Sequence, residues 1–470
     1  MQKNTYSDTV SALCKTLRTD INYDVVPRRF FIGGRKATMF FVDGFAKDEL
    51  LEKVLEFIMS IQSQDIANIH DAATFEKTYI THLEVSTAEA IQAIAVQVLS
   101  GLSALVIEGI SGVTMIEARE YPARGVDEPD TDRVMRGSHD GFVETLVFNT
   151  ALIRRRIRDP RLTMEMTQIG DVSATDVVLC YMQGKADDQQ VKTLRKKLQN
   201  IHIPSLTMAQ ESLAECLCPK QWYNPFPKVR YTERPDGAAA CLNEGQILIL
   251  VDNSAAVMIV PSAMIDFMQD SNDFCFPPLI GTYLRFARGV IFFGTLLLLP
   301  LWYLLVKNPD TVPEALRFLL IKETNEVPLF LQILLSELIV DGIKLASLNT
   351  PNSLNNAFSV VGGLLLGEFA VSAGLFVPEV LLYMAFTATA SFTQPSFEMG
   401  YAFKLFRLLL VVLIALWNWV GFWIGIGIIL LLMATTETVL GKRYLYPLIP
   451  FNGKALLRQI FRFPISKENS

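Results

Sequence analysis

"VVGGLLLGEFAVSAGLFVPEVLLYMAF" (Val360–Phe386) is apolar enough to lie in a lipid bilayer, yet it carries two carboxylates, Glu368 and Glu379. A charged side chain at the centre of a membrane-spanning helix costs about 3 kcal/mol or more. The sequence therefore predicts membrane helices whose ionisable groups face protein or water rather than lipid.

Small residues surround Glu368 in a predicted span from residue 357 to about residue 376. Gly363 and Gly367 form a small-xxx-small pair, which lets helix backbones approach one another closely. Two interpretations of Glu368 stay open. It lies beside a water-filled space between packed helices, or it is buried and pairs with Lys344 or caps a neighbouring helix.

A second polar feature precedes this span, in Thr324–Leu348. Glu337, Asp341 and Lys344 recur at spacings of four and three, so they share one face of a helix. The opposite face is apolar, so this segment lies at the membrane interface or faces other helices. A ring of acidic side chains in an oligomer would favour cations. The predicted pore or cavity residues are Glu368, Gly363, Gly367, Leu364, Val371, Glu337, Asp341 and Lys344.

Apolar residues are unevenly distributed along the 470-residue chain. They make up 51% of it, and the mean hydropathy is +0.31, yet residues 1–280 have a soluble composition. The net charge of −6 argues against a general nucleic-acid binder. Six cysteines without CxxC spacing indicate reduced thiols in a cytosol-facing domain. The polar start lacks an apolar signal-peptide core, so we expect the N-terminal region on the inner side.

The elements predicted in the soluble part indicate an α+β region of two small subdomains. Strand-like runs flank Gly33-Gly34, which predicts a hairpin. Ser86 followed by Glu89 predicts a capping box for a helix that ends at Gly101, and Asp187 is the expected N-cap of a later helix. The predicted divisions are an N-terminal subdomain at 1–80, a second subdomain with its connection at 81–280, a helical membrane domain at 281–440 and a basic tail at 441–470.

Three polar clusters stand out in this soluble part, at residues 124–144, 154–158 and 232–261. Each is either an ion-paired surface or a contact between subdomains or with a neighbouring copy. Pro129 and Pro235 stiffen two of these clusters, which suits docking better than catalysis. The four histidines form no HExxH or metal-spaced pair, and no GxSxG or Walker motif occurs. We therefore expect no enzyme, no cofactor and no metal site.

Four to six apolar segments follow in residues 281–440. Gly289–Val306 is the first clear span, and the preceding Arg285 and Arg288 favour an inner start. Six spans would place both ends of the chain inside, and so would four spans with two interfacial segments. A multi-pass helical membrane domain with an inner N-terminal region and tail is therefore expected.

The last apolar block, residues 405–436, is too long for one span. As a single helix it would measure about 48 Å, whereas a bilayer core is about 30 Å thick. Asn418 and Gly421 supply a break into two shorter helices. Before this block, Pro378 fits the first turn of another helix, with Glu379 beside it.

Several of these motifs together resemble the GerA family of spore germination proteins, over nearly the whole chain. The resemblance is carried by "RGVDEPDTDRVMRGSHDGFVETLVFNTALIRRRIRDPRL" (Arg124–Leu162), "PFPKVRYTERPDGAAACLNEGQILILVDNS" (Pro225–Ser254) and "LLLGEFAVSAGLFVPE" (Leu364–Glu379). Germinant-receptor members usually carry a Glu-Ala-Gly-Arg-Pro-like run where this chain has "VDGIKLASLNTPNSL". This departure favours the sporulation-operon branch of the family over direct germinant sensing.

The resemblance implies an endospore-forming bacterium, the inner spore membrane and A-type subunits that assemble into a complex that passes ions. The implied partners are membrane lipid, further copies of the chain and other spore-membrane proteins, and not nucleic acid. By resemblance, the signature residues of the soluble region are Arg124, Glu128, Pro129, Arg136, Glu144, Arg154, Arg155, Thr232, Glu233, Arg234, Pro235 and Asp236.

Two functional hypotheses follow. The chain is an oligomeric ion-conducting subunit, or it is a non-conducting scaffold whose soluble region docks partners. A membrane enzyme is disfavoured because the sequence has no nucleophile, metal or phosphate motif.

Overall fold

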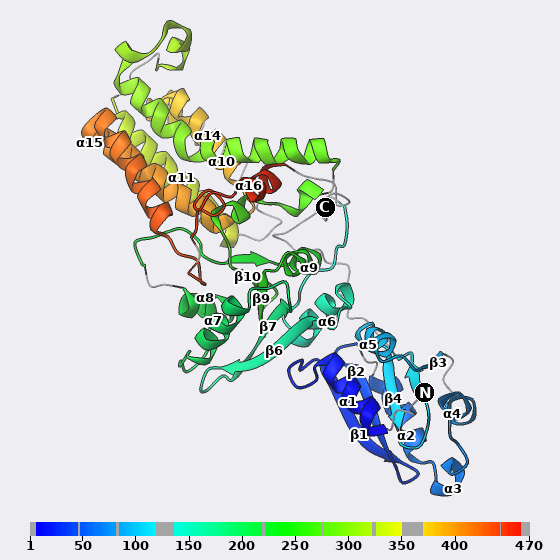
Figure 1. Cartoon of the computed structure of the whole chain (residues 1–470). Coiled ribbons are helices and arrows are strands. Elements are labelled where there is room, and N and C mark those ends of the chain that lie inside the picture. Colours follow the sequence, from blue (N-terminus) through cyan, green and yellow to red (C-terminus); the bar gives the residue numbers. More distant parts are fainter. Residues whose placement is uncertain are drawn as a thin grey trace. The chain divides into compact units, whose positions relative to one another are not determined.

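The computed structural model describes residues 6–45, 48–80, 84–118, 136–218, 221–274, 276–321, 326–349, 370–441 and 443–461 (Figure 1). The chain divides into two compact units. Unit 1 holds Met1–Lys220 and Val229–Ser262, and unit 2 holds Gln221–Lys228 and Ala263–Ser470. Unit 2 thus includes two stretches of the predicted second subdomain (81–280): Gln221–Lys228 and residues 263–280.

The first part of unit 1 is a five-stranded antiparallel sheet in the order β1-β2-β4-β5-β3. Helices lie on both of its faces, and alternate residues of β2 serve the two cores. Phe40 packs with α1 and α5, and Met39 packs with α2, α3 and α4. These elements are β1 (Val25–Ile32), β2 (Arg35–Val42), β3 (Val85–Ala88), β4 (Ser103–Ile107), β5 (Val113–Ile116), α1 (Tyr6–Leu17), α2 (Asp48–Met59), α3 (Ser63–Ile66), α4 (Ala72–Tyr79) and α5 (Ile91–Leu99).

The second part of unit 1 is another five-stranded antiparallel sheet, in the order β6-β7-β9-β10-β8. Asp187 accepts a hydrogen bond from the N–H of Gln189 at 2.9 Å and caps α7, as predicted. Unit 1 is therefore α+β. The elements are β6 (Leu162–Ile169), β7 (Thr175–Met182), β8 (Arg230–Thr232), β9 (Ile247–Val251), β10 (Val257–Val260), α6 (Leu146–Arg156), α7 (Asp188–Gln199), α8 (Gln210–Leu217) and α9 (Pro235–Asn243).

The capping box predicted at Ser86 and Glu89 is wrong. Ser86 lies in β3, where it pairs with Met115 of β5. Helix α5 begins only at Ile91, and its N-cap residue, Ala90, makes no capping hydrogen bond through its side chain. Pairing with the edge of the sheet, a tertiary interaction, overrode the local signal for a helix start. The hairpin expected at Gly33-Gly34 is confirmed, because this turn joins β1 and β2.

A buried ion pair joins the two sheets of unit 1. Arg154 of α6 donates from Nε to Asp24 Oδ2 at 3.0 Å, and from Nη1 to the carbonyl of Leu162 at 3.1 Å. The Arg154 and Asp24 side chains are 0% and 2% exposed. Because loss of one partner from such a pair costs about 3–5 kcal/mol, this contact ties α6 firmly to the start of β1.

Unit 2 is helical. The span predicted at residues 289–306 lies within α10, and Pro378 occupies the first turn of α14, as predicted. Among the described residues, α10 and α15 are the two helices long and apolar enough to cross a membrane. The elements are η1 (Met264–Met268), η2 (Ser271–Phe274), α10 (Pro278–Lys307), η3 (Pro309–Thr311), η4 (Glu314–Leu319), α11 (Leu329–Asn349), α13 (Ala370–Ser372), α14 (Pro378–Ser391), α15 (Phe397–Thr435) and α16 (Gly453–Ile460).

Helix α15 is broken at Asn418, as the sequence predicted. Asn418 has non-helical backbone angles, with φ 53° and ψ −128°. Beyond the break, a Cβ on Gly421 would collide with the carbonyl oxygen of Leu413, and a Cβ on Gly425 would lie 2.6 Å from Leu410 Cδ2. In one straight helix, residues 410 and 425 would be about 22 Å apart. The two halves of α15 therefore double back on each other as a hairpin.

The end of α10 fastens this hairpin at its turn. Lys307 Nζ donates to the carbonyls of Ile414 and Ala415 at 3.1 and 2.9 Å. Asn308, the C-cap of α10, and Asn418 exchange amide hydrogen bonds of 2.6 and 2.7 Å. A cation thus satisfies carbonyls that the first half of α15 leaves free at its C-terminal end.

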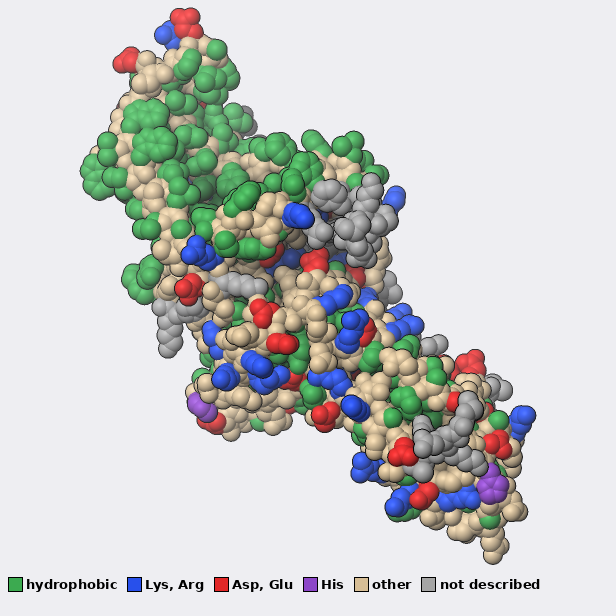
Figure 2. Space-filling view, in the orientation of Figure 1, with side chains coloured by type: hydrophobic (Ala, Val, Ile, Leu, Met, Phe, Trp, Pro, Cys, Tyr) green, Lys and Arg blue, Asp and Glu red, His purple; other side chains and the backbone are tan. Residues whose placement is uncertain are grey.

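The outside of unit 2 is apolar while its interior carries polar groups. Figure 2 shows hydrophobic side chains gathered over the helical unit. Leu382, Trp423 and Leu431 are 67%, 64% and 64% exposed, whereas Glu337 and Arg407 are 3% and 6% exposed. The rest of the interior is mainly apolar. An apolar exterior over buried, paired charges is unusual for a water-soluble domain and is compatible with lipid as the solvent.

We predict that Gly421→Ala destabilises unit 2 by about 1–3 kcal/mol, because the added methyl group has no space beside the Leu413 carbonyl. The measurement is the thermal unfolding midpoint of the full-length protein in detergent. Gly427→Ala is the matched control, since nothing lies within 4 Å of a Cβ at that position. Equal midpoints for the two variants would contradict the doubled-back geometry.

Candidate functional site: a buried charged seam

Ionisable side chains meet inside unit 2, between α11 and α15. Glu337, Asp341 and Lys344 lie along α11 at the spacing that predicted a shared face, and Lys404 and Arg407 of α15 pair with its two carboxylates. We call these five residues the charged seam.

Arg407 makes the most contacts across the seam. Its Nε and Nη2 each lie 2.6 Å from Glu337 Oε1, and its Nη1 donates to the carbonyl of Thr295 at 2.7 Å. The Arg407 and Glu337 side chains are only 7% and 4% exposed. One guanidinium therefore ties α10, α11 and α15 together, in surroundings where losing its partner would cost about 3–5 kcal/mol.

Lys404 lies between the two carboxylates of α11. Its Nζ is 3.3 Å from Glu337 Oε2, and it also forms an ion pair with Asp341. The Asp341 side chain is 35% exposed, whereas that of Lys404 is 11% exposed. The seam is thus buried at the Glu337–Arg407 pair and becomes partly exposed at Asp341.

Lys344 continues the seam toward α14. Its Nζ donates to Ser391 Oγ at 3.0 Å and lies 5.3 and 5.9 Å from the ring centroids of Phe392 and Tyr401. Aromatic faces attract a cation at such distances. With Lys344 included, the seam holds three cations against two carboxylates. Glu337 and Asp341 are therefore compensated negative charges rather than a free acidic ring.

Gln394 extends the polar path between α10 and α14. Its Nε2 donates to Thr295 Oγ1 at 3.1 Å, and the carbonyl of Thr295 in turn accepts from Arg407. The Oε1 of Gln394 is buried and has no hydrogen-bond partner among the described residues. An unsatisfied buried acceptor costs about 1–3 kcal/mol, and this oxygen is closely packed, since a Cβ on Gly400 would lie 2.5 Å from it.

The seam contains three of the predicted cavity residues: Glu337, Asp341 and Lys344. Val371 lies in α13 and is partly buried. Gly363, Leu364, Gly367 and Glu368 lie outside the described residues. Among the residues that the structure describes, no group of side chains has the composition of a metal site.

Sequence reasoning missed Lys404, Arg407, Thr295 and Gln394. A signal for the two cations was present, because "YAFKLFRLLLVVL" places them three residues apart inside an apolar run, and an ionisable residue in such a run marks a functional site by default. Thr295 and Gln394 gave no such signal. They are uncharged, and only tertiary packing brings Thr295 to Arg407 and Gln394 to Thr295.

The signature residues predicted for the soluble region lie in unit 1, where described. The N–H of Phe142 donates to the carbonyl of Glu233 at 2.8 Å, and Arg156 lies 2.6 Å from Asp140, so parts of all three polar clusters meet. Arg136, Glu144 and Arg155 are exposed; Thr232, Arg234 and Pro235 are buried; Glu233 and Asp236 are intermediate; Arg124, Glu128 and Pro129 fall outside the described ranges.

Two charges in this region have unusual surroundings. Burial alone would raise the pKa of Asp140, but hydrogen bonds from Arg156 and Ser138 outweigh it and hold that pKa below its usual value. Arg234 is 1% exposed and donates from Nη2 to Asp236 Oδ2 at 2.6 Å. Its Nε and Nη1 have no hydrogen-bond partner in the described part of the chain.

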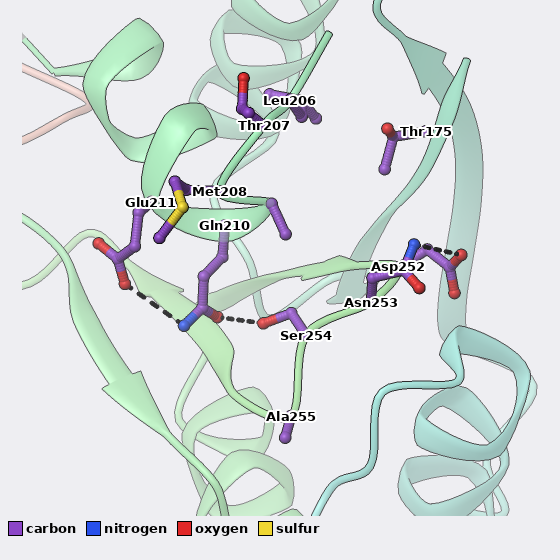
Figure 3. A pocket seen from close by; sticks show the side chains of 11 residues that line it. Thr175, Leu206, Thr207, Met208, Gln210, Glu211, Asp252, Asn253, Ser254 and Ala255 are labelled. Carbon is purple, nitrogen blue, oxygen red and sulfur yellow. Dashed lines mark hydrogen bonds between the residues drawn. The ribbon is translucent and has the colours of Figure 1, made fainter. Parts of the chain in front are cut away.

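A separate pocket lies in unit 1 (Figure 3), with a volume of about 550 Å³. Ser254 Oγ donates to Gln210 Oε1 at 2.7 Å and links two of its walls. Two carboxylates of the lining already have donors within the protein: Asp252 accepts from the N–H of Leu146 at 3.1 Å, and Glu211 accepts from the Tyr231 hydroxyl at 3.3 Å. The lining consists of Thr175, Leu206, Thr207, Met208, Ala209, Gln210, Glu211, Asp252, Asn253, Ser254 and Ala255.

Comparison with known proteins gives a consistent result. The sequence model described as Bacillus/Clostridium GerA spore germination protein matches residues 12–470. Stage V sporulation protein AF of Bacillus subtilis (strain 168) is 37% identical over 94% of this chain and 89% of its own length. Spore germination protein GerLA of Bacillus cereus is 30% identical over 92% of this chain and 87% of its own. The higher identity to the sporulation protein agrees with the branch that the sequence favoured.

A solved structure also matches. The crystal structure of the N-terminal domain of the A subunit of the Bacillus megaterium spore germinant receptor GerK3 shares 28% sequence identity with this chain. The match covers 56% of this chain and 96% of that one, with a TM-score of 0.43.

We predict that Glu337→Gln lowers the stability of unit 2 by about 3–5 kcal/mol, because Arg407 and Lys404 lose a buried counter-charge. Exchanging the pair, Glu337→Arg with Arg407→Glu, should recover part of this loss. The unfolding midpoints of the full-length single and double variants in detergent measure the coupling. Glu314→Gln, at an exposed position of η4, is the control. Strictly additive losses would show that the pair does not interact.

Proposed function

Because the chain belongs to the GerA family of Bacillus and Clostridium spore germination proteins, we propose that it is an integral membrane subunit of a spore germination complex that forms oligomers and conducts ions. The charged seam carries this proposal. Glu337 and Arg407 are almost fully buried in a unit whose outside is apolar. Ionisable residues within membrane helices are rare, and they commonly mark the paths of ions or protons.

The directions of the helices support a multi-pass arrangement in a membrane. Glu337 pairs with Arg407, and Asp341 pairs with the earlier Lys404, so α11 runs opposite to the first half of α15. Helix α10 runs parallel to the first half of α15. Phe292 contacts Phe403, and the later Lys307 contacts the later Ile414, so residue numbers rise in the same direction along both helices. Helix α11 has 21 residues, about 32 Å, which is close to the thickness of a bilayer core.

The alternative is a non-conducting scaffold or signalling subunit. The observation that favours it is that both carboxylates of the described seam are paired with cations. The seam would then fix the packing of the helices, while the exposed charges of unit 1, such as Arg155 and Glu144, dock other spore-membrane proteins. Neither candidate includes a catalytic role, because the matched relatives are named as germination and sporulation proteins.

Potassium efflux from lipid vesicles tests conduction. We expect the purified full-length protein to release K⁺ faster than protein-free vesicles do. Glu368→Gln and Asp341→Asn should each change the efflux roughly tenfold, which corresponds to about 1.4 kcal/mol in a barrier. Glu314→Gln is the matched control, since it removes the charge of an exposed carboxylate away from the seam.

The same preparations separate the two candidates. No efflux from the unmodified protein, together with an unaltered germination rate in spores that carry Glu368→Gln, would contradict conduction. The scaffold candidate instead expects charge reversal at Arg155 and Glu144 to abolish assembly with partners. The size of complexes extracted from spore membranes measures that assembly.

A further inference from the structure

The chain passes from unit 1 into unit 2 at two places. Gln221–Lys228 is a short excursion, after which the chain returns to unit 1, and Ala263 begins the rest of unit 2. The excursion is stiff, because Pro225 and Pro227 flank Phe226. Each proline fixes its own φ and restricts the residue before it. The excursion therefore has few backbone conformations available to it.

Both connections lead to one cluster of aromatic rings within unit 2. Phe226, from the excursion, and Phe267, just after the second entry, lie 5.7 and 6.2 Å from the ring of Tyr444. Phe226 also lies 4.9 Å from the ring of Phe406 on α15. Contacts of this kind stabilise beyond the apolar area that they bury. We call Phe226, Phe267, Phe406 and Tyr444 the aromatic hub.

Hydrogen bonds hold the excursion against the end of α15. Asn224 accepts from the N–H of Phe226 at 3.1 Å and donates from Nδ2 to Thr436 Oγ1 at 2.7 Å. Thr436 is the C-cap of α15. Phe226 is 3% exposed, whereas Trp222 of the same excursion is 95% exposed. Phe226 is therefore the anchor of this segment and Trp222 is not.

Phe406 of the aromatic hub directly precedes Arg407 of the charged seam. A helix is rigid over so short a distance, so a shift or rotation of α15 at Phe406 moves the guanidinium of Arg407 by a similar amount. We infer that Phe226 is a positioning residue for Arg407: through the aromatic hub, the connections from unit 1 set the position of α15 and with it the Glu337–Arg407 pair. The consequence for ion flow rests on the proposed function, whereas the positioning itself does not.

The first test measures helix position without relying on conduction. Spin labels are placed on cysteines introduced at Leu338 of α11 and Leu405 of α15, which are 67% and 55% exposed. The full-length protein, with its native cysteines replaced, is diluted with unlabelled chains in lipid vesicles. We expect Phe226→Ala to shift or broaden the distance distribution between the labels. Phe226→Leu should restore it, and Trp222→Ala should leave it unchanged.

The second test measures K⁺ efflux from the same vesicles. Phe226→Ala should change the efflux by about two- to tenfold, the factor that corresponds to one aromatic contact, and Phe226→Leu should reverse most of the change. In a chain that carries Glu337→Leu and Arg407→Leu, Phe226→Ala should have no additional effect. A merely structural role for Phe226 would instead produce the same further change in both backgrounds.

The outcomes distinguish this inference from the proposed function. An unchanged label distance in Phe226→Ala overturns the positioning role, whatever the efflux. A shifted distance in vesicles that never conduct supports positioning and contradicts conduction. A shifted distance with unaltered efflux overturns the link between the aromatic hub and ion flow. If Phe226→Ala does not fold, Asn224→Ala takes its place, and we expect a smaller shift of the label distance.

Discussion

A guanidinium removed from water needs acceptors for its N–H groups, and the structure of unit 2 depends on how Arg407 finds them. Glu337 of α11 supplies a carboxylate, and Thr295 of α10 supplies a carbonyl. In a unit whose outside is apolar, neither acceptor can be replaced by bulk solvent without moving a helix. The contacts that satisfy the charge of Arg407 therefore determine which three helices are neighbours. They also determine which residues of those helices lie opposite one another.

Unit 1 also contains a buried ion pair between an arginine and a carboxylate. Arg154 pairs with Asp24 and joins the two sheets, and neither side chain reaches solvent. There the pair fixes how α6 lies against the start of β1. In unit 2 the Glu337–Arg407 pair lies inside an apolar exterior, so protein groups rather than bulk water compensate its charges. The two pairs share the same chemistry, and they differ in the exterior that surrounds them, which is apolar in unit 2.

The hairpin of α15 shows how backbone and side-chain constraints combine around the charged seam. Gly421 and Gly425 permit the close approach of the two halves, and Lys307 with Asn308 holds the turn at the end of α10. At the other end, the aromatic hub and the cap at Thr436 receive the connections from unit 1. Arg407 lies in the first half of α15, between Phe406 of the aromatic hub and the turn of the hairpin. Contacts on both sides of Arg407 therefore determine its position.

The sequence alone determined the features whose cause is local. The apolar runs, the break at Asn418, the cap at Asp187, the shared helical face of Glu337, Asp341 and Lys344, and the motifs of the GerA family can all be read along the chain. Tertiary structure decided the rest. It paired Glu337 with Arg407, seventy positions away, drew Ser86 into a strand against a helix-start signal, and placed Phe226 within unit 2. The physical reason is that burial and charge pairing depend on which distant segments meet, and no short stretch of sequence contains that information.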